Sequence, residues 1–232
     1  KDVIIYNTHY IPLQKSNQEL SDSKVYLESA SEQINHLINE KLLTENSIML
    51  DFGCGQGRIV NGFKYLNYNI QDYYGIDTNK DSIKWCQNYL KKYGDQYRFI
   101  HLPAHNSRYN PDESELKKIP IKEESFNLDF LNSVFSHMLE DDVLFYLNEF
   151  YRLLKPNGYI YLTAFIEENV PNVEENPTNY IGNSHGPLHR VRYDKFYFFE
   201  LVKRNDFEIF KFYHQLISRT KQSVVILKKR IK

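Results

Sequence analysis

Short apolar runs and amphipathic segments alternate along most of this chain. Apolar runs of about four to eight residues between turn-forming residues are typical of buried strands. Apolar residues at three- and four-residue steps are typical of helices that cover a sheet. The pattern predicts strands at 48–50, 73–77, 97–102, from 125 onward, and at 159–165, 207–214 and 222–227, and helices at 24–43, 59–66, 81–92, 140–154 and 194–204.

The alternation of these elements favours an α/β fold with a parallel sheet between helices. Residues 1–23 are polar and predict an irregular arm, and residues 110–124 predict a charged surface loop. Residues 166–193 form a long insertion, which is usually functional or disordered. We expect one domain over 1–232, made of an arm and cap helix (1–44), a core (45–165), an inserted lid (166–193) and a C-terminal helix with closing strands (194–232).

The most informative stretch joins the first predicted strand to its helix. Asp51 ends the apolar run, and Gly53, Gly55 and Gly57 follow at alternate positions. Glycines permit a tight turn and let a ligand lie against bare backbone, and the next helix offers free N–H groups. Arg58 stands where the nicotinamide fingerprint has its third glycine, so a dinucleotide loop is disfavoured.

The pattern Asp51-x-Gly53-x-Gly55-x-Gly57 resembles motif I of the class I S-adenosylmethionine (SAM)-dependent methyltransferases. Gly75–Asn79 and the turn Leu154–Gly158 also match the usual form of this family, so the resemblance covers roughly residues 45–165. It implies a Rossmann-like, doubly wound, seven-stranded and mostly parallel sheet with an antiparallel last strand. It also implies SAM as the cofactor and S-adenosylhomocysteine as the product.

The resemblance assigns residues to the cofactor. Asp51 and the glycine loop would hold the methionyl end of SAM, and Asp77 would accept the ribose hydroxyls, as acids at this point of dinucleotide sites do. The loop with Ala104 would lie near the adenine, although the Asp that many family members carry there is missing. The expected cofactor-binding residues are Asp51, Gly53, Cys54, Gly55, Gly57, Asp77, Thr78, Ala104, Asn132 and Ser133.

The composition restricts the ligands. A net charge of −1 over 232 residues leaves no broad basic field for nucleic acid. Two cysteines allow neither a disulfide framework nor a cysteine-rich zinc site, and His101 and His105 lack a third ligand nearby, so we expect no metal. Asp141, Asp142 and the histidines keep open the alternative of a metal that lowers the pKa of the acceptor hydroxyl. No signal peptide or membrane span is evident, which favours a cytoplasmic enzyme, and a homo-oligomer is left open.

Methyl transfer to a hydroxyl gains from a general base, and histidine suits that role near neutral pH. His137, after the fourth strand, is the first candidate, followed by His185 and His189 in the insertion. An equal alternative is that His137 merely braces its loop. The segment Asn132–Phe135 lacks the two prolines of the nucleobase-amine methyltransferases, which argues against that chemistry.

Tyr26–Ala30, the glycine loop and Phe135–Met138 together resemble a bacterial methyltransferase group associated with surface glycans and nucleotide-activated sugars. This resemblance implies O-methylation of a sugar hydroxyl, on a nucleotide-activated sugar or a precursor in capsule or surface polysaccharide biosynthesis. Arg190 and Arg192 would suit a diphosphate but could equally pair with acids of their own segment. The expected acceptor-binding residues are Tyr26, Arg190, Arg192 and Tyr193.

Other functions stay open on the sequence. One is SAM-dependent methylation of another small molecule, at oxygen or nitrogen. Another is a module that binds SAM without catalysis. A third is a dinucleotide-dependent oxidoreductase whose loop departs from its fingerprint.

Overall fold

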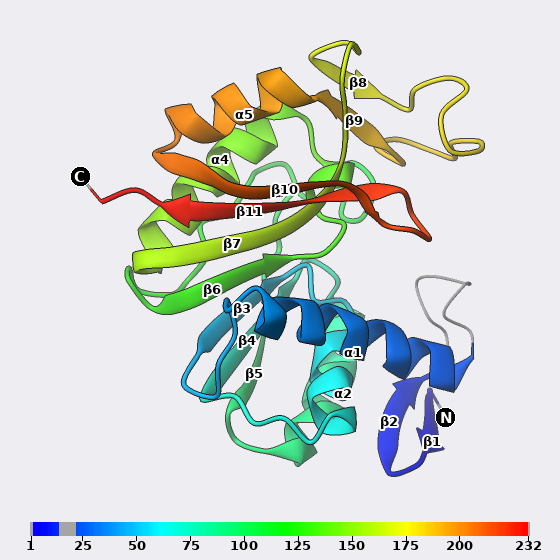
Figure 1. Ribbon diagram of the computed structural model, residues 1–232. Coiled ribbons are helices and arrows are strands. Elements are labelled where there is room, and N and C mark those ends of the chain that lie inside the picture. The colour runs from blue at the N-terminus through cyan, green and yellow to red at the C-terminus, as the bar shows by residue number, and fades with distance from the viewer. Residues whose placement is uncertain (1, 14–21, 232) are drawn as a thin grey trace. The chain divides into compact units, whose positions relative to one another are not determined.

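The computed structural model describes residues 2–13 and 22–231 of the chain (Figure 1). The chain divides into two compact units, residues 1–102 and 103–232, which are described in turn. Residues 14–21 of the expected N-terminal arm lie outside the described residues. Among the described helices, none has the length and apolar character needed to cross a membrane.

The start of the chain is a β-hairpin, so the prediction of an irregular arm was wrong. β1 (Val3–Tyr6) pairs antiparallel with β2 (His9–Pro12) through the two residues Asn7 and Thr8. Both turn residues have positive φ, 46° and 68°, which is the conformation of a type I′ hairpin turn. The β-branched residues of the first strand and the Asn in the turn were the sequence signals for this hairpin.

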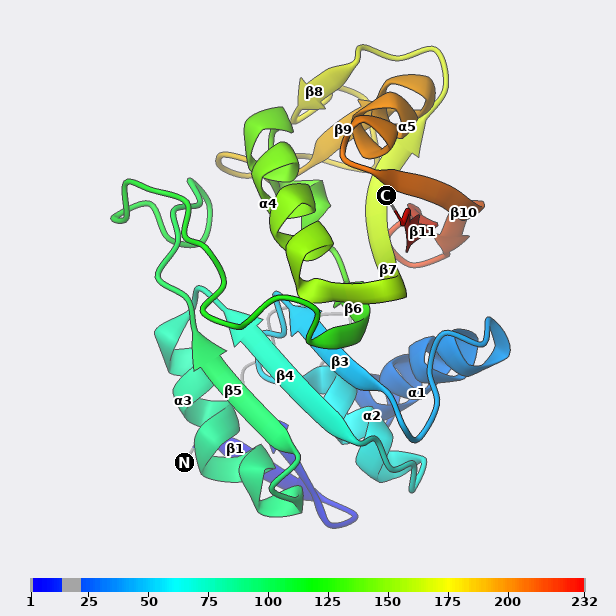
Figure 2. The same cartoon turned by 90° about the vertical axis from the view of Figure 1, so that its left-hand side faces the viewer.

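The first unit carries a parallel sheet in the order β3-β4-β5 (Figure 2). Its strands are β3 (Ile48–Phe52), β4 (Asp72–Asp77) and β5 (Tyr97–His101), and its helices are α1 (Ser23–Asn39), α2 (Arg58–Tyr65) and α3 (Lys80–Tyr89), followed by the 3-10 turn Leu90–Tyr93. Helices α1 and α2 pack closely, because a Cβ at Gly62 would lie 2.8 Å from that of Ala30. Phe52 is paired with Ile76, so β3 and β4 end side by side.

The second unit carries a sheet in the order β6-β7-β11-β10. These strands are β6 (Phe126–Leu131), β7 (Leu154–Glu167), β11 (Gln222–Lys229) and β10 (Phe207–Ile217). β6 is parallel to β7, and β11 is antiparallel to both β7 and β10. The carboxyl ends of β6, β7 and β10 therefore meet the start of β11 at one edge, which we call the carboxyl edge of the second unit.

The remaining elements of the second unit are the 3-10 turn Phe135–His137, the helices α4 (Glu140–Leu153) and α5 (Lys195–Arg204), and the short strands β8 (Val173–Glu175) and β9 (Val191–Asp194). The inserted segment 166–193 is thus partly ordered as sheet, because β9 pairs with both β7 and β8. The helix α5 begins after Asp194, whose carboxylate accepts the N–H groups of Phe196 and Tyr197 at 3.0 Å each.

These elements confirm the predicted α/β class, with parallel strands and an antiparallel β11 near the end of the chain. The predicted turn at 154–158 was wrong in detail, because β7 already begins at Leu154. Asn157, with a φ of 63°, and a shift in the pairing between β6 and β7 mark this irregular start of the strand. The single-domain organisation stays a prediction.

Candidate functional site

Backbone hydrogen bonds to β4 fix the glycine loop that follows β3. The N–H groups of Gly53 and Cys54 both donate to the carbonyl of Ile76, at 2.8 and 3.0 Å, and that of Gly57 donates to the carbonyl of Cys54 at 2.9 Å. Gly53, Gly55 and Gly57 have φ values of 79°, 52° and 66°, in the left-handed region that favours glycine. The three glycines are therefore a requirement of the backbone itself.

Gly55 and Gly57 differ in their surroundings. A Cβ at Gly57 would lie 2.3 Å from Cδ1 of Leu90, so this glycine is packed against its own unit. A Cβ at Gly55 would meet nothing within 4 Å. The loop thus presents bare backbone to open space at Gly55, as a cradle for a ligand requires.

The thiol of Cys54 lies beside Cys86 and the backbone of Gly55. Its side chain is buried, and Sγ lies 3.5 Å from the carbonyl oxygen of Gly55, as does Sγ of Cys86. Burial and the neighbouring Cys86 raise the pKa of Cys54 well above its ordinary value. The side chain is therefore a neutral packing group, and only the backbone of Cys54 is suited to ligand binding.

Asp77, at the end of β4, is tied to the glycine loop. Its Oδ2 accepts the N–H of Gly55 and its Oδ1 that of Asn79, both at 2.7 Å. Burial raises the pKa of Asp77, whereas these backbone donors lower it. Each carboxylate oxygen can accept two hydrogen bonds, so Oδ2, which accepts one from Gly55, can still accept a hydroxyl donor. The next residue, Thr78, has its carbonyl 3.1 Å from Nε2 of His101.

Asp51 lies within β3 and is 3% exposed. It accepts the hydroxyl of Tyr73 at 2.5 Å. Burial raises the pKa of Asp51 to about 7, although the Tyr73 hydrogen bond and the Arg58 guanidinium oppose the shift. A cation placed beside this carboxyl group would favour its ionised form.

His137 lies at the carboxyl edge of the second unit, at the end of its 3-10 turn. Its Nδ1 lies 2.8 Å from the carbonyl oxygen of Leu188, so a neutral ring donates from Nδ1 and keeps a lone pair on Nε2. Burial lowers the pKa of His137 to about 4. The hydrogen bond to Leu188 raises this pKa, whereas the charges of Arg108, His189 and Arg190 lower it further. The imidazole is therefore neutral at physiological pH.

Arg108 is a functional candidate that the sequence did not single out. Through Nη1 it donates to the carbonyls of His185 and Pro187, at 2.9 and 3.3 Å, and thereby holds the insertion. Its Nε is buried and has no hydrogen-bond partner among the described residues. In the sequence, Arg108 is distinguished only by being a positively charged residue in the loop that also contains Ala104.

Arg190 and two histidines lie in the same region. Arg190 donates through Nη1 to the carbonyl of Asn183 at 2.9 Å and to Oγ of Ser184 at 3.1 Å. The N–H of His185 donates to Nδ1 of His189 at 2.8 Å. Burial and the charges of Arg190 and Arg108 lower the pKa of His189. We call Arg108 and Arg190 the cationic cluster, and His185 and His189 lie beside it.

Arg192 and Tyr193 make contacts inside the second unit. Arg192 forms an ion pair with Glu174, and its guanidinium lies 4.7 Å from the ring centre of Tyr180. Tyr193 is fully buried and donates its hydroxyl to the carbonyl of Met138 at 2.7 Å. Both contacts stabilise the insertion, and the acceptor role of these two residues stays a prediction.

Two further predicted residues have buried side chains. Tyr26 is 4% exposed and packs with Ile11 and Leu27 in the first unit. Ala104 is 1% exposed, and its carbonyl accepts a hydrogen bond from Nδ2 of Asn110 at 2.9 Å. Their ligand-binding roles stay predictions.

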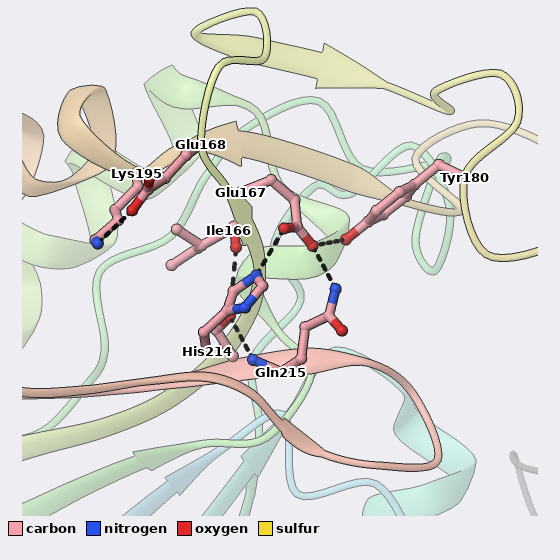
Figure 3. A network of polar contacts seen from close by, with 8 residues as sticks. Ile166, Glu167, Glu168, Tyr180, Lys195, His214 and Gln215 are labelled. Atoms are coloured by element: carbon pink, nitrogen blue, oxygen red, sulfur yellow. Dashed lines mark hydrogen bonds and ion pairs between the residues drawn. The ribbon is translucent and has the colours of Figure 1, made fainter.

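Glu167, at the end of β7, is the centre of a polar network (Figure 3). Its carboxylate accepts the Tyr180 hydroxyl and the Gln215 amide, both at 2.9 Å, and lies 2.7 Å from Nε2 of His214. Burial opposes ionisation, but these donors hold the pKa of Glu167 below its ordinary value. The network connects the insertion, through Tyr180, with β10, and no local pattern of residues indicates it.

Comparisons with known proteins agree with this geometry. A model of the methyltransferase domain family matches residues 50–162, which include the glycine loop, Asp77 and His137. A solved SAM-dependent methyltransferase from Methanosarcina mazei is 18% identical with a TM-score of 0.61, over 84% of this chain and 98% of that chain.

Two other solved structures share the fold. The 1,6-didemethyltoxoflavin N1-methyltransferase of Burkholderia thailandensis, bound to S-adenosylhomocysteine, is 17% identical with a TM-score of 0.58, over 90% of this chain and 80% of that chain. The [4+2]-cyclase SpnF is 13% identical with a TM-score of 0.61, over 88% of this chain and 82% of that chain. At these identities the likeness shows the fold.

The fold is the Rossmann-like fold seen in class I methyltransferases, and residues 50–162 match the model of the methyltransferase domain family. The cofactor that the comparisons support is SAM. The residues present fit it, because Gly55 offers open backbone and Asp77 and Asp51 offer carboxylates for hydroxyl and ammonium groups. When bound, SAM supplies a methyl group activated by a positive sulfonium centre.

We expect the affinity for S-adenosylhomocysteine to rise with pH through neutrality. Below pH 7 the buried Asp51 is mostly protonated, and above it the carboxylate is ready to pair with the ligand's ammonium group. For a pKa of about 7, the affinity should increase about fifteenfold between pH 5.5 and 7.0. Isothermal titration calorimetry measures this directly. Asp51→Asn should bind weakly with no such pH dependence, and an unchanged slope in that variant would exclude Asp51 as the titrating group.

Proposed function

We propose that this protein transfers a methyl group from SAM to a hydroxyl of an anionic sugar. The favoured acceptors are a nucleotide-activated sugar or a phosphorylated precursor of a capsule or surface polysaccharide. The observation that carries the proposal is the cationic cluster beside His137 in one compact unit. A hydroxyl acceptor must lose its proton and an anionic acceptor needs cations beside it, and these residues serve both needs.

His137 supports the proposal through its tautomer. Because Nδ1 donates to the carbonyl of Leu188, Nε2 carries the lone pair, and none of the described residues donates to it. This nitrogen would take the hydroxyl proton as the acceptor oxygen becomes methylated. A pKa of about 4 makes His137 a weak base, but it keeps the ring in its basic form at every physiological pH.

Arg108 supports an anionic acceptor. A buried N–H without a partner is costly, and an oxygen of a phosphate would satisfy Nε of Arg108. The guanidinium group suits phosphates because it is planar and always charged. His185 and His189 stay secondary candidates for the base, and Nδ1 of His189 already accepts the N–H of His185. A cytoplasmic location and a homo-oligomer stay predictions.

The test is a screen of purified protein with SAM against free sugars, nucleotide sugars and unrelated small hydroxyl and amine compounds. We expect turnover with an anionic sugar and competitive inhibition by the matching nucleoside diphosphate. Methylation of amines alone, or no turnover with any sugar, would contradict the proposal.

With that acceptor, His137→Gln should lower kcat about a hundredfold and leave SAM affinity within about twofold. Glutamine keeps a donor for the carbonyl of Leu188 but has no basic nitrogen. In the natural protein kcat at saturating SAM should stay flat from pH 6 to 8, because the pKa of His137 is about 4. His36→Gln, on α1, is the control, and its kcat should equal that of the natural protein. A natural rate for His137→Gln would move the base to His185 or His189.

A further inference from the structure

The turn after β6 contains a serine in an unusual backbone conformation. Ser133 has a φ of 62°, in the left-handed region that non-glycine residues rarely adopt. Asn132 lies before it, and the 3-10 turn that ends in His137 follows it. The conformation of Ser133 therefore sets the directions of Asn132 and His137 relative to each other.

A closed ring of hydrogen bonds holds this serine. The N–H of Ser133 donates to Oγ1 of Thr163 at 2.8 Å, and the Thr163 hydroxyl donates to Oε1 of Gln222 at 2.6 Å. The ring closes where Nε2 of Gln222 donates to Oγ of Ser133 at 2.6 Å. Oγ of Ser133 also lies 3.2 Å from Oγ of the fully buried Ser136. We call Ser133, Thr163 and Gln222 the polar ring.

Gln222 enters the polar ring from a rigid strand. It is 3% exposed and occupies the first position of β11. On the other face of β11, Oγ of Ser223 accepts the N–H of Gln215 at 3.1 Å and donates to the carbonyl of Ile166 at 3.3 Å. Figure 3 shows Gln215 and Ile166 in this region. These bonds anchor the start of β11 without the polar ring.

We propose that Gln222 is a positioning residue, which keeps Ser133 in the left-handed conformation and thereby directs Asn132 and His137. Gln222 lies outside the matched residues 50–162, in the C-terminal hairpin of β10 and β11. Its effect on the turn is independent of the acceptor. Its effect on turnover rests on the proposed function, through His137.

Removal of the Gln222 side-chain amide would weaken the support for the left-handed conformation of Ser133. The hydroxyl of Thr163 would lose its acceptor and Oγ of Ser133 its donor. Two of the three bonds of the polar ring would then be lost, which weakens the resistance to a return of Ser133 to negative φ. That change rotates the following peptide and moves His137. Glycine adopts positive φ without support. The substitution Ser133→Gly should therefore make the turn independent of Gln222.

The experiment introduces Gln222→Leu into the natural protein and into Ser133→Gly. An NMR titration of the His137 imidazole reports on the turn without any acceptor. In Gln222→Leu, the pKa of His137 should rise from about 4 toward the ordinary histidine value, as water reaches the ring. We expect Gln222→Leu to bind S-adenosylhomocysteine about tenfold more weakly than the natural protein, as measured by calorimetry. The double variant should bind it within about twofold of Ser133→Gly alone.

Ser223→Ala is the matched control, because it removes contacts of the neighbouring residue and leaves the polar ring intact. We expect Ser223→Ala to have the same His137 pKa and the same S-adenosylhomocysteine affinity as the natural protein, even if its urea denaturation midpoint is lower. If Gln222→Leu does not fold, Gln222→Met takes its place, because it keeps a side chain of similar length without the amide. The proposal is overturned if the Gln222 variant titrates and binds like the natural protein, or if Ser133→Gly gives no protection. A natural protein that methylates no sugar would overturn the proposed function and leave this result standing.

Discussion

Asp77→Ala should weaken SAM binding about a thousandfold. The variant removes the carboxylate expected to accept the ribose hydroxyls, and each such charge-assisted hydrogen bond contributes about 1.5–3 kcal/mol. It also frees the N–H of Gly55, which Asp77 holds at 2.7 Å, so the glycine loop loses its connection to the end of β4. Calorimetry with SAM and S-adenosylhomocysteine measures both losses.

Asp72→Ala is the control for this experiment. Asp72 begins the same strand, but it pairs with Arg98 at the opposite end of β4, and that arginine side chain is 42% exposed. We expect this variant to bind SAM within about twofold of the natural protein, because exposed ion pairs contribute little. Equal losses for Asp77→Ala and Asp72→Ala would mean that β4 has merely been destabilised. Undiminished affinity in Asp77→Ala would remove Asp77 from the cofactor site.

Alanine at Gly55 and at Gly57 should separate binding from stability. At Gly55 the added methyl group meets nothing within 4 Å. The stability should therefore fall only by the cost of positive φ in a residue with a Cβ, about 1–2 kcal/mol. The methyl group would, however, occupy the space in which the cofactor is expected to lie. We expect Gly55→Ala to reduce SAM affinity several hundredfold, on the order of 3–4 kcal/mol, in a protein that is still folded at 25 °C.

Gly57→Ala should behave in the opposite way. Its Cβ would lie 2.3 Å from Cδ1 of Leu90, so about 1–3 kcal/mol of overpacking adds to the cost of positive φ. We expect a loss of about 3 kcal/mol in the free energy of unfolding, measured by urea denaturation. If Gly55→Ala bound SAM normally, or if the two variants lost stability equally, the open cradle at Gly55 would not be the binding surface.

Parts of the site could be predicted from the sequence because they depend on neighbours along the chain. Positive φ at Gly53, Gly55 and Gly57 follows from a strand that turns at once into a helix. Asp77 ends a strand that the apolar pattern already marked. In contrast, the N-terminal hairpin was missed because the polar residues of the arm outweighed the β-branched residues of Val3–Tyr6.

Other parts required contacts between segments far apart in the chain. Arg108 approaches His185 only through the folded insertion, and Glu167 meets His214 and Gln215 only because β10 lies near the end of β7. No local pattern of residue types distinguishes these side chains from ordinary surface charges. The candidate acceptor side of the protein was therefore the least predictable part.

The amino-acid sequence by itself determined the alternation of strands and helices, the glycine loop and the acids at the strand ends. These features follow from backbone sterics and from the burial of apolar residues at regular spacing. The tertiary structure alone decided the chemical state of the site: a pKa of about 7 at Asp51, a neutral His137, and a Ser133 held by Gln222. Protonation and side-chain direction depend on local burial and on partners many residues away, and folding is the step that brings those partners together.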